Sequence, residues 1–73
     1  MALIGKTQEY AIEKVRTGFK IYANDTWWHI IMIRVYEEDI YSFTCDAPFM
    51  GKIAFCIKKS EHPTVWIRKN ANY

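Results

Sequence analysis

Four side chains that could bind a metal ion or act as nucleophiles are spread along the 73-residue chain: Cys45, Cys56, His29 and His62. By composition they could form a zinc site, but no two are a close ligand pair and the cysteines fall on opposite faces of the expected strands. Residues 37–39, Glu-Glu-Asp, are typical of a polar turn, and one acidic cluster is weak support for a divalent ion. The sequence has no nucleophile–base pair, glycine-rich phosphate loop or cofactor motif. It therefore predicts no metal site, no cofactor and no enzymatic activity.

Basic and aromatic side chains indicate a second kind of chemistry, the binding of single-stranded nucleic acid. Arg68 and Lys69 follow Trp66, and such groups hold a phosphate backbone by charge and bases by stacking. Trp66 is equally expected at an interface with another protein. Tyr41 follows an acidic turn and could stack on a base, although its alternation with Phe43 slightly favours a place in the core. The net charge of +2 permits contact with nucleic acid without requiring it.

Composition and length limit the kind of protein that can carry these groups. A chain of 73 residues that is 51% hydrophobic and 16% aromatic folds rather than staying disordered, with room for one domain over residues 1–73 and a small core. Two cysteines without a CxxC spacing favour a reducing compartment, and no secretory signal is visible, so we expect a cytoplasmic protein. The longest run without charge, residues 26–33, is too short for a membrane helix.

The elements expected to position these groups are one helix and five strands. Ala11, Ile12 and Val15 recur at helical spacing between an N-cap at Thr7 and a C-cap at Gly18, which predicts a helix over about residues 7–17. After Gly18 the hydrophobic period is two, and turn residues separate short strands. The expected strands span about residues 19–23, 27–36, 40–45, 52–58 and 64–68. The pattern predicts a mainly β fold, a short N-terminal helix followed by a small antiparallel barrel.

The second expected strand is apolar on both faces, which a soluble barrel does not need. One face carries Trp28, Ile30 and Met32, and the other carries Trp27, Ile31 and Ile33. We expect another protein surface to cover the outer face, most economically a second copy of the chain. Trp28 and Trp66 are the residues expected at that interface, and unpaired outer strands could join copies by backbone pairing.

Several segments resemble Hfq-type Sm-like proteins. They are Gln8 near the start of the expected helix, residues 19–22 (Phe-Lys-Ile-Tyr) running into Asn24-Asp25, residues 39–41 (Asp-Ile-Tyr), and Lys58-Lys59 followed by residues 62–65 (His-Pro-Thr-Val). The order of elements covers most of the chain. Three features depart from the family pattern: the second strand lacks a glycine that would ease its bend, Asn-Asp stands in place of Asn-Gly, and the final loop is longer than the family's compact form, which leaves the register of His62 open.

The resemblance implies a strongly bent five-stranded, SH3-like barrel, assembled into a ring of about five to seven copies by pairing of edge strands. It also implies binding of single-stranded RNA, with uridine-rich RNA as one candidate. The candidate RNA-binding residues are Gln8, Tyr41, Lys59 and His62, together with Arg16 in a basic rim at the end of the expected helix and Tyr22 on a second RNA-binding face. Gln8 could read a uracil edge through its amide, while Lys59 and His62 could meet phosphates and base edges. These residues can also be explained without RNA. Gln8 would be an ordinary surface residue, Lys59 and His62 would belong to a solvated loop, and Arg16 would compensate the helix dipole.

Two functions follow from these observations. The first is an RNA-binding Sm-like ring with a role in post-transcriptional regulation. The second is a small SH3-like module that binds another protein through its tryptophans, without RNA, and the low net charge favours it.

Overall fold

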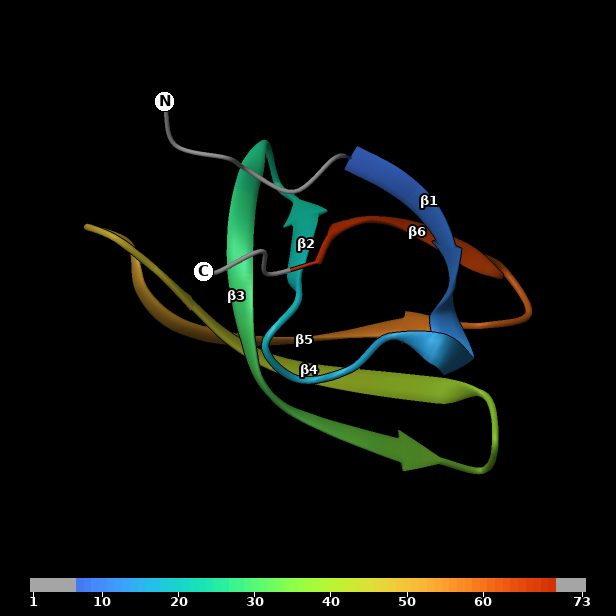
Figure 1. The fold of residues 1–73 in the computed structure, drawn as a ribbon. Helices are drawn as coiled ribbons and strands as arrows, with labels where there is room; N and C mark the ends of the chain where they lie inside the picture. The colour runs from blue at the N-terminus through green and yellow to red at the C-terminus, as the bar shows by residue number, and fades with distance from the viewer. Residues whose placement is uncertain (1–6, 70–73) are drawn as a thin grey trace.

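The structure, a computed structural model, describes residues 7–69 as one six-stranded antiparallel sheet (Figure 1). The strand order across the sheet is β1-β6-β2-β3-β4-β5. The strands are β1 (Thr7–Ala11), β2 (Lys20–Ala23), β3 (Thr26–Tyr36), β4 (Ile40–Ala47), β5 (Gly51–Lys58) and β6 (Thr64–Arg68). The mainly β fold is confirmed, and the last five strands lie close to their predicted positions.

The predicted N-terminal helix is wrong. Its first half is the strand β1, which pairs antiparallel with β6 from Thr7 opposite Arg68 to Ala11 opposite Thr64. The chain then makes a single 3-10 turn, η1 (Ile12–Lys14). A helix this short has little stability of its own, whereas pairing with β6 satisfies the backbone of β1 in full along one edge. Ile12 still reaches the core, and its backbone N–H donates to the carbonyl of Pro63 at 3.0 Å.

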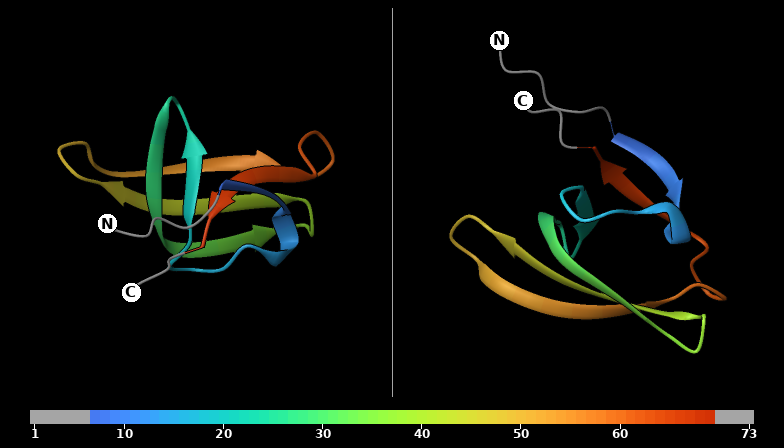
Figure 2. Two further views of the ribbon diagram at one scale, coloured as in Figure 1. Left: turned by 45° about the horizontal axis from the view of Figure 1, so that its top comes forward. Right: turned by 60° about the horizontal axis from the view of Figure 1, so that its bottom comes forward.

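The expected closed five-stranded barrel is also corrected, because the sheet is open. Strands β1 and β5 are its two edges and do not pair with each other. The sheet curves strongly, so that the β1–β6 part faces the β4–β5 part across the core (Figure 2). Strand β1 occupies the outer edge of β6, which leaves β6 paired on both sides, by β1 and β2. In this arrangement the outer edge of the last strand is not free for pairing between copies.

A β-bulge in β3 explains the strand that looked apolar on both faces. Ile30 lies opposite Cys45, but Met32 lies opposite the next residue of β4, Thr44, so Ile31 is an extra residue in the ladder. One extra residue exchanges the inward and outward positions for the rest of the strand. The inward residues are therefore Trp28 and Ile30 before the bulge and Ile33 after it. A bulge also bends its strand, which supplies curvature in a strand that contains no glycine.

The core lies between the two halves of the curved sheet. It consists of Ile12, Val15, Ile21, Trp28, Ile30, Tyr41, Phe43, Cys45, Ala47, Val65 and Ile67. Trp28, expected at an interface, is only 3% exposed and belongs to this core. Its ring N–H is satisfied inside the chain, since Nε1 donates to the carbonyl of Ala23 at 2.9 Å. Trp28 is thus unavailable to a partner.

Candidate nucleic-acid interface

The outer face of strands β6, β2 and β3 carries an aromatic row beside a basic row. The register places Lys20 opposite both Arg68 and His29, and Tyr22 opposite Trp27. Trp66 precedes Arg68 by two residues and so shares its face of the sheet. We call this surface the aromatic–basic face; its aromatic row is Tyr22, Trp27 and Trp66, and its basic row is Lys20, Arg68 and His29.

The aromatic row is well exposed for side chains of this size. Tyr22 is 43% exposed and Trp66 is 51% exposed, and the Tyr22 and Trp27 rings lie 5.2 Å apart at a tilt of 55°. The hairpin between β2 and β3 fixes this pair, because Asn24 and Asp25 both have positive φ, as a two-residue type I′ turn requires. The turn residue Asp25 also accepts a hydrogen bond from the Tyr22 hydroxyl at 3.3 Å.

Two hollows lie on either side of Tyr22 and Trp66. The first, about 330 Å³, is lined by these two rings with Trp27 and Thr7. The second, about 460 Å³, is lined by the same two rings and by polar side chains that include His62, Asn24 and Thr64. Flat aromatic walls with a few polar groups at the edge suit planar, partly polar rings such as nucleobases.

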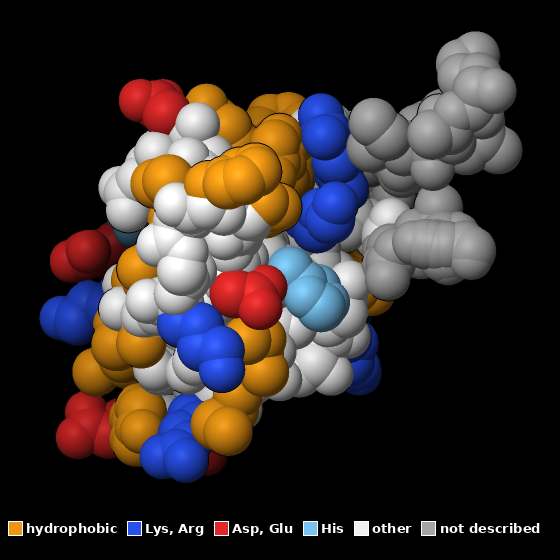
Figure 3. Space-filling view, turned by 90° about the vertical axis from the view of Figure 1, so that its left-hand side faces the viewer, with side chains coloured by type: hydrophobic (Ala, Val, Ile, Leu, Met, Phe, Trp, Pro, Cys, Tyr) orange, Lys and Arg blue, Asp and Glu red, His pale blue; other side chains and the backbone are white. Residues whose placement is uncertain are grey.

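Positive charge lies directly beside the rings. The Arg68 guanidinium carbon is 4.1 Å from the centre of the Trp27 ring, and Arg68 Nε donates to Thr7 Oγ1 at 3.1 Å. These two contacts hold the guanidinium in place, and no carboxylate among residues 7–69 forms an ion pair with it, so its charge stays available to an anion. Lys20, exposed in the middle of the basic row, has no acidic partner among residues 7–69. Hydrophobic and basic side chains also adjoin on the face drawn in Figure 3.

Acidic side chains border the face and limit its positive potential. His29 Nδ1 lies 3.6 Å from Asp46 Oδ1, with both side chains exposed. Glu9, opposite Trp66 on β1, accepts a hydrogen bond from the Thr64 hydroxyl at 2.8 Å. The face is therefore only moderately basic, which predicts modest affinity that is sensitive to salt.

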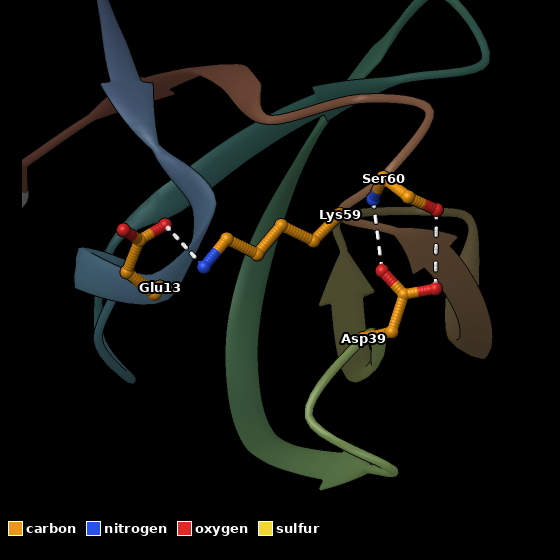
Figure 4. Close-up of polar contacts among 4 residues, drawn as sticks. All are labelled: Glu13, Asp39, Lys59 and Ser60. Atoms are coloured by element: carbon orange, nitrogen blue, oxygen red, sulfur yellow. Dashed lines mark hydrogen bonds and ion pairs between the residues drawn. The ribbon is translucent and has the colours of Figure 1, made fainter.

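Of the residues singled out in the sequence, Tyr22, His62 and Trp66 come together on this face. Lys59 does not join them. Its Nζ lies 3.7 Å from Glu13 Oε1, so the side chain points toward η1 and its charge is partly compensated (Figure 4). The loop that carries Lys59 is held by Asp39, which accepts hydrogen bonds from the Ser60 N–H at 2.8 Å and the Ser60 hydroxyl at 3.1 Å.

The remaining candidates lie elsewhere. Tyr41 is 8% exposed in the core, so it cannot offer its ring face to a base. Its edge lines a separate hollow of about 300 Å³ together with Arg16 and Val35. Gln8 is half-buried on β1 opposite the buried Ile67, and so faces inward, away from the aromatic–basic face.

Trp27 and Lys20 belong to this face but were not predicted as nucleic-acid-binding residues. The signal that could have found them is strand periodicity: Lys20 and Tyr22 alternate with the buried Ile21, and Trp27 and His29 alternate with the buried Trp28. Only the register between β2 and β3 shows that the two outward pairs adjoin.

The cysteines occupy chemically different positions. Cys45 is fully buried in β4, whereas Cys56 is exposed on β5. Burial raises the pKa of the Cys45 thiol from 9.0 to about 11, and the negative charge of Asp46 adds to the shift. A neutral buried thiol is a poor nucleophile. Within residues 7–69, no three His, Cys, Asp or Glu side chains cluster as metal ligands would.

In the described part of the chain no helix is long and apolar enough to cross a bilayer. Comparison of the chain with protein-family models, curated proteins and solved structures finds no match.

Proposed function

We propose that this chain is an RNA-binding protein that engages single-stranded RNA through the aromatic–basic face, acting in the cytoplasm in post-transcriptional regulation rather than as an enzyme. One observation carries the proposal: two exposed aromatic side chains, Tyr22 and Trp66, and the half-buried Trp27 adjoin Arg68 and Lys20 on an open sheet face. Aromatic faces stack on any base, and neighbouring cations attract the phosphates between bases. Duplexes offer no unstacked bases, so single strands are the expected ligand.

Energetics favour Tyr22 and Trp66 as the main contacts. Stacking of one base on an aromatic side chain is worth about 1–3 kcal/mol, and both rings are already exposed and supported from below by the sheet. Arg68 is expected to contribute through charge and through its stack on Trp27. Lys59 and Arg16 lie outside the face and are expected to contribute little.

The resemblance to Sm-like proteins and the ring of about five to seven copies stay predictions. Two observations weaken their physical basis. The bulge in β3 turns Trp28, Ile30 and Ile33 inward, so fewer apolar side chains of that strand need a cover, although Ile31 and Met32 stay exposed. Strand β1 occupies the edge of β6 that ring pairing would use.

The experiment is fluorescence anisotropy with labelled single-stranded RNA oligomers, uridine-rich and adenine-rich, over a series of salt concentrations. Tyr22→Ala should weaken binding by about 5- to 150-fold, the equivalent of one lost stack. Tyr36→Ala is the matched control, because Tyr36 is 47% exposed but lies at the far end of β3. Lys20→Gln should weaken binding and flatten its salt dependence. Equal affinity of the Tyr22 and Tyr36 variants, or no binding by the unaltered protein at low salt, would refute the proposal.

A protein-binding module is the second candidate, favoured by one observation. The hollow between Tyr22, Trp27 and Trp66 is mostly apolar, and aromatic-lined grooves also accept extended, proline-rich peptides. Pull-down from lysate with and without nuclease separates the two functions. Partners that survive nuclease and are lost with Trp66→Ala would favour the module.

A further inference from the structure

Strand β5 is an uncovered edge of the sheet. Along one edge it pairs with β4 over its whole length, from Gly51 opposite Ala47 to Lys58 opposite Ile40, and along the other edge no strand within residues 7–69 pairs with it. At eight residues it is longer than the other edge strand, β1, which has five. A long unpaired edge exposes backbone donors and acceptors that a further strand can satisfy.

The inward side chains of β5 are incompletely covered. Ile53, Phe55 and Ile57 pack against the core but are only half-buried, in contrast to Phe43 and Cys45 on the neighbouring strand, which are fully buried. The Phe55 ring contacts Phe43 on one side, at a centroid distance of 5.8 Å. A strand added beyond β5 would bring inward side chains of its own against the uncovered side of this row.

The hairpin between β4 and β5 adds a second unexplained apolar feature. Phe49 is fully exposed and Met50 is 58% exposed. Phe49 also has a φ of 67°, a conformation that is unfavourable for a bulky residue other than glycine. An exposed, strained aromatic at the end of an uncovered edge is expected where it contacts something.

We propose that β5 pairs antiparallel with β5 of a second copy of the chain, about a two-fold axis at Ala54. Outward side chains favour this register over the one centred on Phe55. Centring on Phe55 would place Lys52 opposite the partner's Lys58, a directly opposed like-charge pair. Centring on Ala54 instead places Lys52 opposite the partner's Cys56 and leaves the small Ala54 facing its own copy.

The Ala54 register also accounts for the half-buried inward row of β5 and for the exposed Phe49–Met50 tip. Inside the sheet it places Ile53 opposite the partner's Phe55, and Phe55 opposite the partner's Ile53, which completes the apolar row. At the strand ends it places Met50 opposite the partner's Lys58, whose side chain then lies beside the Phe49–Met50 tip. Lysine stems and ammonium groups cover aromatic rings well.

A two-fold pair fits this chain better than a ring. An isologous interface uses one surface twice and closes by itself, whereas a ring needs two different complementary edges. The edge of β6 is occupied by β1, and β1 offers only a short second edge. The proposal does not depend on RNA binding, because β5 contributes no residue to the aromatic and basic rows and only Ile57 to the second hollow beside them.

The first test is light scattering coupled to size exclusion over a concentration series of the full chain. The unaltered protein should form dimers, and Ala54→Lys, which brings two lysines together at the axis, should shift it to monomer. Thr7→Lys, an exposed change on the other edge strand, is the control and should leave the dimer intact. Circular dichroism checks that each variant is folded. A monomer at every concentration, or a dimer unaffected by Ala54→Lys, would overturn the proposal.

The second test fixes the register and serves even if Ala54→Lys does not fold. With Cys56→Ser, the variant Ala54→Cys should form a disulfide-linked dimer under mild oxidation, because directly opposed residues are within disulfide range. The unaltered chain, whose Cys56 faces the partner's Lys52, should cross-link far less. Rapid cross-linking through Cys56, or none through position 54, would overturn the Ala54 register.

Discussion

Adjacent isoleucines in β3 offer a sharp test of the bulge. Ile30 is 1% exposed and Ile31 is 40% exposed, although both stand in one uninterrupted apolar run. Strict alternation would put Ile31 and Ile33 on one face of the strand. The bulge instead puts Ile30 and Ile33 on the core side and leaves Ile31 as the extra residue. Substitution by valine removes one methylene, and it keeps β-branching and strand propensity nearly unchanged.

The magnitudes follow from burial. Ile30→Val should lower the free energy of unfolding by about 0.5–1.5 kcal/mol, the usual cost of a methylene lost from a packed core. Ile33→Val should cost somewhat less, because Ile33 is half-buried against the core. Ile31→Val should change stability by less than about 0.5 kcal/mol, as at an ordinary surface site.

The assay is urea unfolding followed by tryptophan fluorescence, to which the buried Trp28 contributes together with Trp27 and Trp66, with the slope of the transition checked for constancy among the variants. Substitution of the same two positions by lysine gives a stronger test. Ile31→Lys should still fold, whereas Ile30→Lys should not, because it buries an unpaired charge. If Ile31→Val costs as much as Ile30→Val, or Ile31 and Ile33 prove costly while Ile30 does not, the bulge is wrong. The argument for a covered second face would then return.

Three further predictions address a thiol, a turn and a loop. The free energy of unfolding should fall by up to about 3 kcal/mol as the pH rises from 9 through about 11. The reason is that the folded state keeps the Cys45 thiol neutral, whereas the same thiol ionises at 9.0 in the unfolded chain. Cys45→Val should flatten this decline, and Cys56→Ser should leave it unchanged. Asp25→Gly should raise the thermal midpoint by relieving positive φ, at a gain of about 0.5–1 kcal/mol, and should strengthen RNA binding by removing a negative charge beside Tyr22. Asp39→Asn should lower stability by about 0.5–1.5 kcal/mol in urea unfolding, because an amide replaces the carboxylate that accepts both hydrogen bonds from Ser60, and Glu38→Gln on the same turn should be neutral.

Strand positions were predictable from the sequence because alternation and turn residues are local signals. Ile40 to Cys45 alternates strictly, and the structure pairs it in one register with β5 throughout. The tight turn at Asn24 and Asp25 was equally predictable from the sequence, since these residues tolerate the positive φ that they adopt.

The N-terminal segment was misread because its local pattern fits two periods. Ile12 and Val15 are core residues at helical spacing, but Gln8 and Tyr10 also alternate with Thr7 and Glu9 as in a strand. Pairing with β6, some 55 residues away in the chain, decides between the two, and no local signal contains that contact. The predicted Gln8 site loses the helical turn on which it was based, because in β1 Gln8 lies opposite Ile67 on the inward face.

The candidate site depends on cross-strand register for the same reason. Tyr22 and Trp66 were each visible as aromatic residues near basic ones, but their adjacency comes from β6 pairing with β2 across more than forty residues of chain. Conversely, Tyr41 and Lys59 have side chains equally suited to RNA binding. Tyr41 is buried in the core, however, and the Lys59 side chain points to Glu13.

The bulge at Ile31 connects the fold to both proposals. Without it, β3 could not send Trp28 and Ile30 inward near one end and Ile33 inward near the other, and one half of the strand would present its isoleucines to water. With it, the face outside β3 near Trp27 is free to hold aromatic and basic side chains instead of an oligomer interface. The demand for a partner then moves to β5, whose half-buried inward row and exposed Phe49 remain uncovered. Because the surfaces for self-association and for RNA are separate, a dimer would offer two RNA-binding faces at once. Two linked faces bind one long RNA strand more tightly than either face binds a short one.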